Sequence, residues 1–79
     1  MEAMEAMVAE IARCLVAHPE QVEVERLQGD SRLVIALQVA EEDVGQVIGR
    51  GGRVATALRT VLRAAASERG QRVALDIVD

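Results

Sequence analysis

Three glycines fall within four residues in the middle of the chain, in the run Val47-Ile48-Gly49-Arg50-Gly51-Gly52-Arg53-Val54. Apolar residues lead into this run, and an alanine-rich pattern with helical spacing follows it to about Glu68. So many glycines end one element and force a tight turn before the next helix begins. The first N–H groups of a helix have no partner within it and lie at its positive end, where they favour phosphate. Since two arginines add positive charge beside this turn, we expect the functional site here.

The chain has 79 residues, which is enough for one small domain and too few for two cores. We therefore expect a single domain over residues 1–79. It contains no Phe, Tyr or Trp, so aliphatic side chains, alanine and methionine must form the core. A domain of this size without a disulfide or a metal cluster is marginally stable, which points to a dimer interface or a bound partner as a further source of stability.

The net charge of −4 hides a strong segregation of charge along the chain. Residues 1–43 carry ten acidic residues against three arginines, whereas residues 44–72 carry six arginines against one glutamate. A basic half in an acidic chain indicates contact with a polyanion on one side of the molecule. The alternative is that the arginines form an ordinary solvated helix face.

Two reactive residue types each occur once, as Cys14 and His18. Cys14 falls near the apolar stripe of the first helix and is expected to be a small buried thiol. His18 is expected at the C-terminal end of that helix, where a positive charge suits the helix dipole. With no carboxylate pair, nucleophile with a base, or metal-ligand spacing, the chain is not expected to be an enzyme, and no catalytic residue, metal or cofactor is predicted. No signal peptide or membrane-length apolar run is visible, so we expect a cytoplasmic protein that does not contact a membrane.

The spacing of apolar residues predicts six elements in the order α-β-β-α-α-β. The expected ranges are a helix over 2–17 that His18-Pro19 stops, strands over 21–27 and 32–39 that form a hairpin around the turn at 28–31, helices over 41–48 and 52–68, and a strand over 73–78. Gly45 lies inside the second helix, where a glycine suits close approach of another backbone. The apolar face of the third helix is predicted to comprise Val54, Ala57, Leu58, Val61, Leu62 and Ala65.

Three kinds of glycine turn bind phosphate groups, and the context separates them. A nucleotide-binding P-loop needs a following lysine and hydroxyl after a strand, and a dinucleotide-binding turn needs a strand before the glycines and a parallel βαβ unit. Here a helix precedes the glycines and no lysine occurs in the chain. The remaining kind is a helix–GxxG–helix turn, with which KH domains clamp about four nucleotides of a nucleic-acid backbone.

The chain resembles the KH family in its type II topology, and within that family its small stand-alone bacterial members. The resemblance extends over nearly the whole chain, through residues 17–25 (AHPEQVEVE), residues 41–66 (EEDVGQVIGRGGRVATALRTVLRAAA) and residues 72–79 (RVALDIVD). It implies an α+β fold in which three helices pack on one face of a three-stranded sheet.

The resemblance also implies an RNA-binding site at the turn, with these residues: Ile48, Gly49, Arg50, Gly51, Gly52, Arg53 and Val54. Gly49 to Gly52 would contact the sugar-phosphate backbone, and Arg53 a neighbouring phosphate. Ile48 and Val54 match positions that help to form the floor of a shallow groove for bases, between the helices that flank the loop and one strand of the sheet; both are also expected to pack in the core. Gly51 makes this loop more flexible than one with a polar residue there, so we expect modest affinity from one site.

The function so implied is non-catalytic binding of single-stranded RNA with low sequence specificity, as a post-transcriptional regulator or RNA chaperone without a small-molecule substrate. Arg59 and Arg63 either extend this site or are simply solvated, while Arg69 and Arg72 lie at the opposite end of the third helix and are not expected to contact the same short RNA segment. The alternative function is a protein-interaction module. The run Ala64-Ala65-Ala66 suits close helix approach, and the resemblance implies a homodimer and a heterodimer with a larger KH protein of the KhpB/Jag type.

Overall fold

Strand β2 (Leu33–Gln38) is the central strand of a three-stranded sheet in the computed structural model, which describes residues 3–29 and 32–78. Its alternate residues Leu33, Ile35 and Leu37 are fully buried. Strand β1 (Glu23–Gln28) pairs with β2 in the antiparallel direction, and strand β3 (Val73–Val78) pairs with it in the parallel direction. The predicted hairpin is thus confirmed, although residues 30 and 31 of its turn lie outside the described residues.

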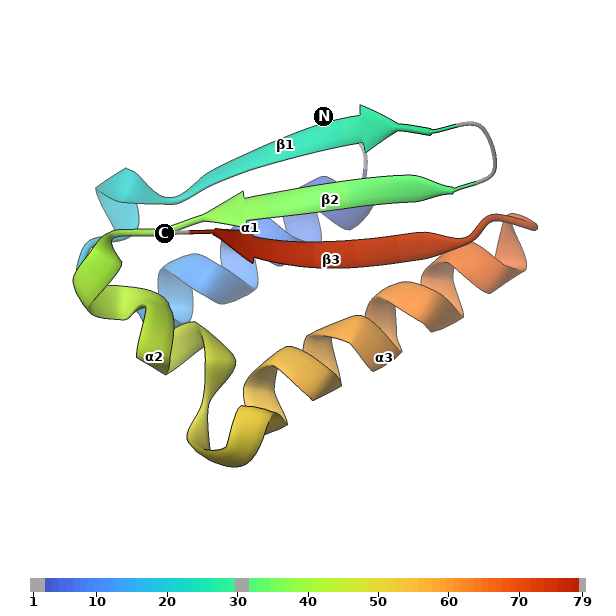
Figure 1. Ribbon diagram of the computed structural model, residues 1–79. Helices are drawn as coiled ribbons and strands as arrows, with labels where there is room; N and C mark the ends of the chain where they lie inside the picture. The colour runs from blue at the N-terminus through green and yellow to red at the C-terminus, as the bar shows by residue number, and fades with distance from the viewer. Residues whose placement is uncertain (1–2, 30–31, 79) are drawn as a thin grey trace.

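The helices α1 (Ala3–Leu15), α2 (Val44–Ile48) and α3 (Arg53–Glu68) all cover the same face of this sheet (Figure 1). A parallel strand pair needs a crossover connection, which α2 and α3 supply between β2 and β3. Short 3-10 turns at Pro19–Gln21, Glu41–Asp43 and Arg50–Gly52 join the elements. The predicted order α-β-β-α-α-β and the α+β arrangement of a type II KH fold are confirmed.

The core lies between the inner face of the sheet and the three helices. Each helix contributes apolar side chains to this core from one of its faces. The sheet contributes the buried side chains of its inner face. The fully buried side chains of largest volume are Leu33, Ile35, Leu37, Leu62, Val8 and Val47. The opposite face of the sheet is left without a covering layer in the described part of the chain (Figure 1).

Helix α3 has its buried stripe rotated from the predicted one. The stripe that faces the sheet comprises Ala55, Leu58, Leu62 and Ala66. Val61 and Ala57, which we predicted on the apolar face, are exposed, and the exposed fraction of Val61 is 46%. The apolar sector of this helix is wider than the area that the sheet covers, so its remaining part faces outward.

Three further expectations are wrong or find no support in the described residues. Cys14 is exposed, because it lies about 200° around the helix from buried Ala12, on the other side of α1. A Cβ placed on Gly45 would meet no heavy atom within 4 Å, so no backbone approaches this glycine. In the run of three alanines, Ala66 is buried in the core of the chain itself and only Ala64 is exposed.

Within residues 3–29 and 32–78, no helix combines the length and the apolar character needed to cross a membrane.

Candidate functional site

The loop between α2 and α3 consists of two successive tight turns. The N–H of Gly49 donates to the carbonyl of Gly45 at 2.9 Å and ends α2, and the N–H of Gly52 donates to the carbonyl of Gly49 at 3.0 Å. Gly49, Gly51 and Gly52 have φ angles of 78°, 65° and 78°, in the region that side chains disfavour. The glycine cluster is therefore required by the backbone, and it places α3 directly after the turn.

Gly49 is the most constrained of the three. A Cβ at this position would lie 2.5 Å from Cγ2 of Val54 and 2.9 Å from its backbone nitrogen. A Cβ at Gly51 or Gly52 would meet nothing within 4 Å. Close contact of Gly49 with Val54 thus fixes the entry to the loop, whereas the tip of the loop stays open to a ligand.

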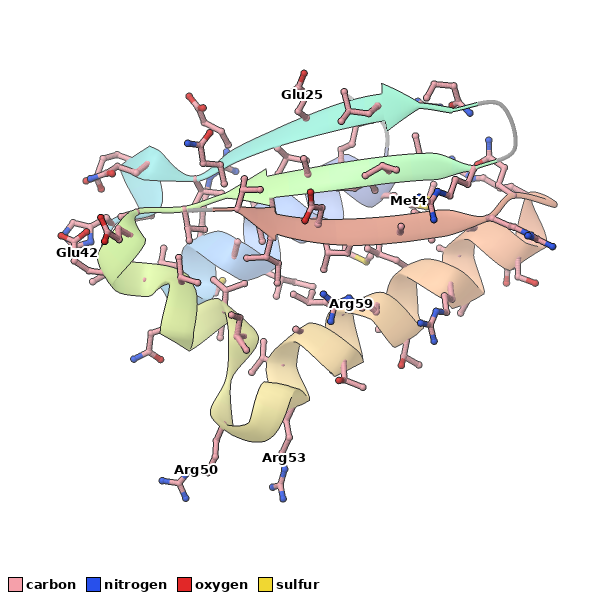
Figure 2. All side chains as sticks on the ribbon, in the orientation of Figure 1. Met4, Glu25, Glu42, Arg50, Arg53 and Arg59 are labelled. Atoms are coloured by element: carbon pink, nitrogen blue, oxygen red, sulfur yellow. The ribbon has the colours of Figure 1, made fainter. Side chains whose placement is uncertain are left out.

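The tip of the loop presents positive groups to solvent. Arg50 and Arg53 are exposed and point away from the body of the molecule (Figure 2). No side chain caps the N-terminus of α3, while the backbone N–H groups of Gly52 and Arg53 already donate to the carbonyls of Gly49 and Arg50. The positive end of the helix dipole, with two exposed guanidinium groups beside it, is an arrangement suited to a phosphate.

The apolar residues that flank the glycines separate in the structure. Ile48 is 38% exposed and does not belong to the core, so the expectation that it packs there is wrong. Val54 is half-buried and packs against the core, as expected, and it lies beneath Gly49. Ile48 is thus available to a ligand, while Val54 supports the loop.

Two grooves run along opposite sides of α3. The first lies between α3 and β3 and combines arginines with a short strand segment; its lining comprises Arg32, Arg59, Leu62, Arg63, Val73, Ala74 and Leu75. The second lies between α1 and α3 and is almost entirely apolar; its lining comprises Ile11, Leu15, Arg53, Val54, Ala57, Leu58 and Val61. Val54 therefore belongs to the apolar groove and not to the groove beside β3.

Comparison with known proteins decides the family. The model of the KhpA/KhpB KH domain matches residues 5–77. The chain belongs to the KhpA/KhpB KH-domain family. Several curated relatives carry the name RNA-binding protein KhpA. The proteins from Clostridium acetobutylicum and Caldanaerobacter subterraneus are 41% and 44% identical over 75 residues, which cover 95% of this chain and 100% of each relative. The protein from Treponema pallidum is 48% identical over 75 residues, covering 95% of this chain and 94% of that protein.

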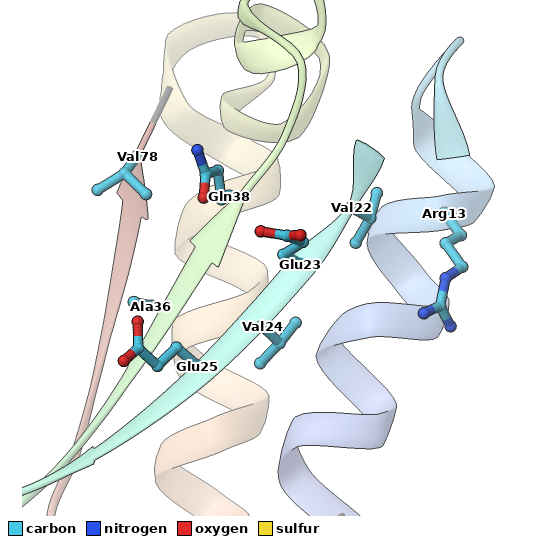
Figure 3. Close-up of a pocket in the computed structure, with 8 residues that line it drawn as sticks. All are labelled: Arg13, Val22, Glu23, Val24, Glu25, Ala36, Gln38 and Val78. Atoms are coloured by element: carbon cyan, nitrogen blue, oxygen red, sulfur yellow. The ribbon is translucent and has the colours of Figure 1, made fainter. Parts of the chain in front are cut away.

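The charge segregation of this KH domain is also spatial. Figure 2 shows Glu25 and Glu42 at the β1 and α2 sides of the molecule, and Arg50, Arg53 and Arg59 around the loop and α3. A shallow hollow beside β1 is lined by Glu23 and Glu25 on the outer face of the sheet, with Val22 and Val24 on the side toward α1, which contributes Arg13 (Figure 3). Two carboxylates against one arginine disfavour a polyanion in this hollow, so the side of the molecule with Arg50, Arg53 and Arg59 is favoured for nucleic acid.

A carboxylate that the sequence analysis passed over organises the end of α1. Asp43 is only 3% exposed, and its carboxylate accepts hydrogen bonds from the N–H groups of Ala17 at 3.2 Å and His18 at 3.0 Å. The ring Nδ1 of His18 lies 3.0 Å from the same carboxylate. In the sequence, Asp43 stands out only as the last of three consecutive acidic residues at the start of the predicted helix over 41–48. Its position opposite a chain reversal at His18-Pro19 is a tertiary contact that no local pattern reveals.

The contact between Asp43 and His18 shifts the pKa of both groups. The hydrogen bond that the His18 ring donates to the Asp43 carboxylate raises the pKa of His18, against the smaller effect of desolvation. Burial alone would raise the pKa of Asp43, but the hydrogen bonds from the His18 ring and from the two N–H groups outweigh it and leave this pKa lowered. The chain's one histidine is thus part of a structural clamp. In the described residues, no three His, Cys, Asp or Glu side chains gather to hold a metal ion.

Proposed function

We propose that this chain is a non-catalytic RNA-binding protein that holds single-stranded RNA at the loop Gly49–Gly52. The observation that carries the proposal is an uncapped N-terminus of α3 between exposed Arg50 and Arg53, in a family whose relatives bear the name RNA-binding protein. A phosphate at the loop lies at the positive end of the α3 dipole, and the two arginines bind it and its neighbours.

The bases of the bound strand lie in the groove between α3 and β3. Strand β3 is at the edge of the sheet, so its outer N–H and C=O groups can pair with the polar edges of bases. Ile48 offers an exposed apolar surface near the loop, and Arg59 offers a guanidinium plane on the side of α3 that faces β3 (Figure 2). No aromatic platform is present in the chain, so recognition rests on phosphates and shape, and sequence specificity is low.

Such a binder has modest affinity per site and releases RNA readily, which suits an RNA chaperone or a post-transcriptional regulator. The proposal includes no reaction, because neither residue with a reactive side chain lies at the glycine loop. His18 is held by Asp43, and Cys14 lies on α1. An exposed free thiol fits a reducing compartment, and we place the protein in the cytoplasm.

The decisive experiment replaces Arg50 and Gly51 together by aspartate. Both positions have room for a side chain, and aspartate tolerates the left-handed conformation of Gly51 better than most residues. The double variant R50D/G51D should lose binding to a labelled poly-uridine oligonucleotide in fluorescence anisotropy, because two carboxylates repel the phosphate. The variant R50N/G51N has nearly the same shape without negative charge and should keep part of the affinity. Full binding by a folded R50D/G51D protein would refute the loop as the site.

A second function, self-assembly, is favoured by the apolar groove between α1 and α3. Leu15 and Val61 are 37% and 46% exposed there, at the outer faces of two neighbouring helices. A second copy of the chain is the occupant we propose, because the same apolar patch on both partners can pair about a two-fold axis and cover these side chains. The family model spans KhpA and KhpB domains, so a larger KH protein of the KhpB/Jag type can offer a similar surface for a heterodimer.

A further inference from the structure

A second cluster of arginines lies at the far end of α3 from the glycine loop. The parallel register pairs Leu33 with Val73, and the N–H of Leu33 donates to the carbonyl of Arg72 at 2.8 Å. This register brings Arg32, which precedes β2, beside Arg72, which precedes β3. Arg63 reaches the same place from α3, and the three arginines line one hollow together with Gln71 and Val73.

Neighbouring structure does not neutralise this cluster. Arg32, Arg63 and Arg72 are all exposed. Among residues 3–29 and 32–78, no carboxylate forms an ion pair with any of the three. Three like charges around one hollow repel one another, and an anion in the hollow relieves this repulsion.

The cluster is connected to the loop along one side of α3. Arg32 and Arg63 line both the hollow and the groove between α3 and β3, and Arg59 lies in that groove one helical turn closer to the loop. Ten residues of helix separate Arg53 from Arg63, which corresponds to about 15 Å along the axis. One phosphate cannot reach both ends, but a strand that leaves the loop along the groove passes Arg59 and arrives at the cluster.

We propose that Arg32, Arg63 and Arg72 form a second phosphate-binding site, which holds the RNA strand beyond the roughly four nucleotides clamped at the glycine loop. The inference rests on the proposed function, since it takes the loop as the first contact of the same strand. Its ligand class is the phosphodiester backbone of single-stranded RNA. It predicts that the chain distinguishes RNA strands by length.

The experiment measures binding of labelled oligo-uridines of about four and about twelve nucleotides by fluorescence anisotropy, with the full chain and with R63Q/R72Q. The variant should bind the longer strand at least about fivefold more weakly than the unaltered chain, and the shorter strand nearly as well. A longer strand also offers more binding registers, and comparison of two proteins at each length cancels this statistical factor. For the longer strand, the slope of log affinity against log salt should decrease by about 0.7 for each phosphate that the variant no longer neutralises.

The matched control is R13Q/R26Q, which removes two positive charges from the acidic side of the molecule. Arg13 forms an exposed ion pair with Glu10, which contributes little to stability, and Arg26 lies 3.8 Å from the carboxylate of Glu5. Equal weakening of the longer strand by both double variants would reduce the effect to net charge and overturn the proposal. The proposal would also be overturned if R63Q/R72Q weakened binding of both strand lengths equally. A variant that changed the oligomeric state and not the RNA affinity would assign the arginines to a protein contact and would overturn the proposal as well.

The test separates this inference from the proposed function. If the loop variant R50D/G51D abolishes binding of the short strand and R63Q/R72Q leaves the preference for the long strand unchanged, the second site is refuted and the loop stands. If the unaltered chain binds neither strand, both proposals fail. Circular dichroism melting of each variant checks that it is folded.

Discussion

At the scale of single residues, the clamp between Asp43 and His18 links the stability of the domain to pH. A buried carboxylate holds two N–H groups and an imidazole across 25 residues of chain, so it fixes the reversal between α1 and β1 against the start of α2. The pKa of His18 is raised and the pKa of Asp43 is lowered by this contact. Each shift means that folding favours the charged form of that group.

We therefore predict that the free energy of unfolding has its largest clamp contribution between about pH 4 and pH 6.5, the ordinary pKa values of the two groups. The contribution of His18 is complete below its unfolded pKa and is lost as the pH rises through the raised folded pKa. The contribution of Asp43 is complete above its unfolded pKa and is lost as the pH falls through the lowered folded pKa. Thermal melting between pH 5.5 and 8.5 should show a falling melting temperature that H18Q flattens. A nuclear magnetic resonance titration of the one histidine should give a pKa above 6.5 that D43N lowers.

Gly49 is the residue at which the loop is most sensitive to substitution. Its φ of 78° and ψ of 167° fall in a region that is accessible essentially to glycine alone, and a Cβ there collides with Val54. Gly51 has φ 65° and ψ 18°, which is the ordinary left-handed region, and its surroundings are open.

G49A should therefore lower the free energy of unfolding by about 3 kcal/mol or more, and G51A by about 1 kcal/mol. Urea denaturation of the two variants measures both. Equal losses would mean that the contact with Val54 relaxes at little cost.

At the scale of elements, the sequence predicted where each helix and strand lies but not which side of α3 is covered. The spacing of apolar residues identifies an apolar face of α3, and part of this face is indeed buried. The sheet covers only the part that carries Leu58 and Leu62. Val61 belongs to the same sector by spacing and is nonetheless exposed. The difference depends on how far α1 lies from α3, and local spacing contains no information about that distance.

The loop itself was predictable because its requirements are local. Three glycines, a helical pattern on each side and two arginines specify the turn within eight residues. Arg32 was not predictable as a neighbour of Arg72, because their contact depends on the parallel register of β2 and β3 across 40 residues of chain. The sequence patterns did not predict contacts between elements, such as the proximity of Arg32 and Arg72 and the hydrogen bond between Asp43 and His18.

We predict that V61N prevents self-association and leaves the monomer nearly as stable. Val61 is half exposed, so its replacement removes little burial within the chain, and valine and asparagine have similar helix propensities. Sedimentation velocity should give a dimer for the unaltered chain and a monomer for V61N. A64N changes an exposed residue of the same helix outside the groove and should remain dimeric. A dimeric V61N protein, or a monomeric A64N protein, would place the interface elsewhere.

At the scale of the whole molecule, the fold separates three surfaces by chemistry. The glycine loop and the groove between α3 and β3 are positively charged, the β1 edge is acidic, and the groove between α1 and α3 is apolar. Because the apolar groove and the arginine groove lie on opposite sides of α3, pairing of two copies through the first leaves the second accessible, and only Arg53 of the glycine loop lines the apolar groove as well. The two proposed functions, self-assembly and RNA binding, are therefore compatible in one small domain.

This arrangement predicts that dimerisation increases affinity for long RNA and not for short RNA. A strand of about twelve nucleotides contacts one copy, whereas a strand several times longer can reach the loops of both copies, and the second contact then forms at high effective concentration. V61N should bind the strand of about twelve nucleotides like the unaltered chain, and the strand several times longer at least about tenfold more weakly. A64N should bind both strands like the unaltered chain. Anisotropy titrations at protein concentrations where the unaltered chain is dimeric measure this ratio. If monomeric V61N keeps the full affinity for the long strand, the two loops of a dimer do not share one RNA molecule, and the dimer has a purpose other than RNA affinity.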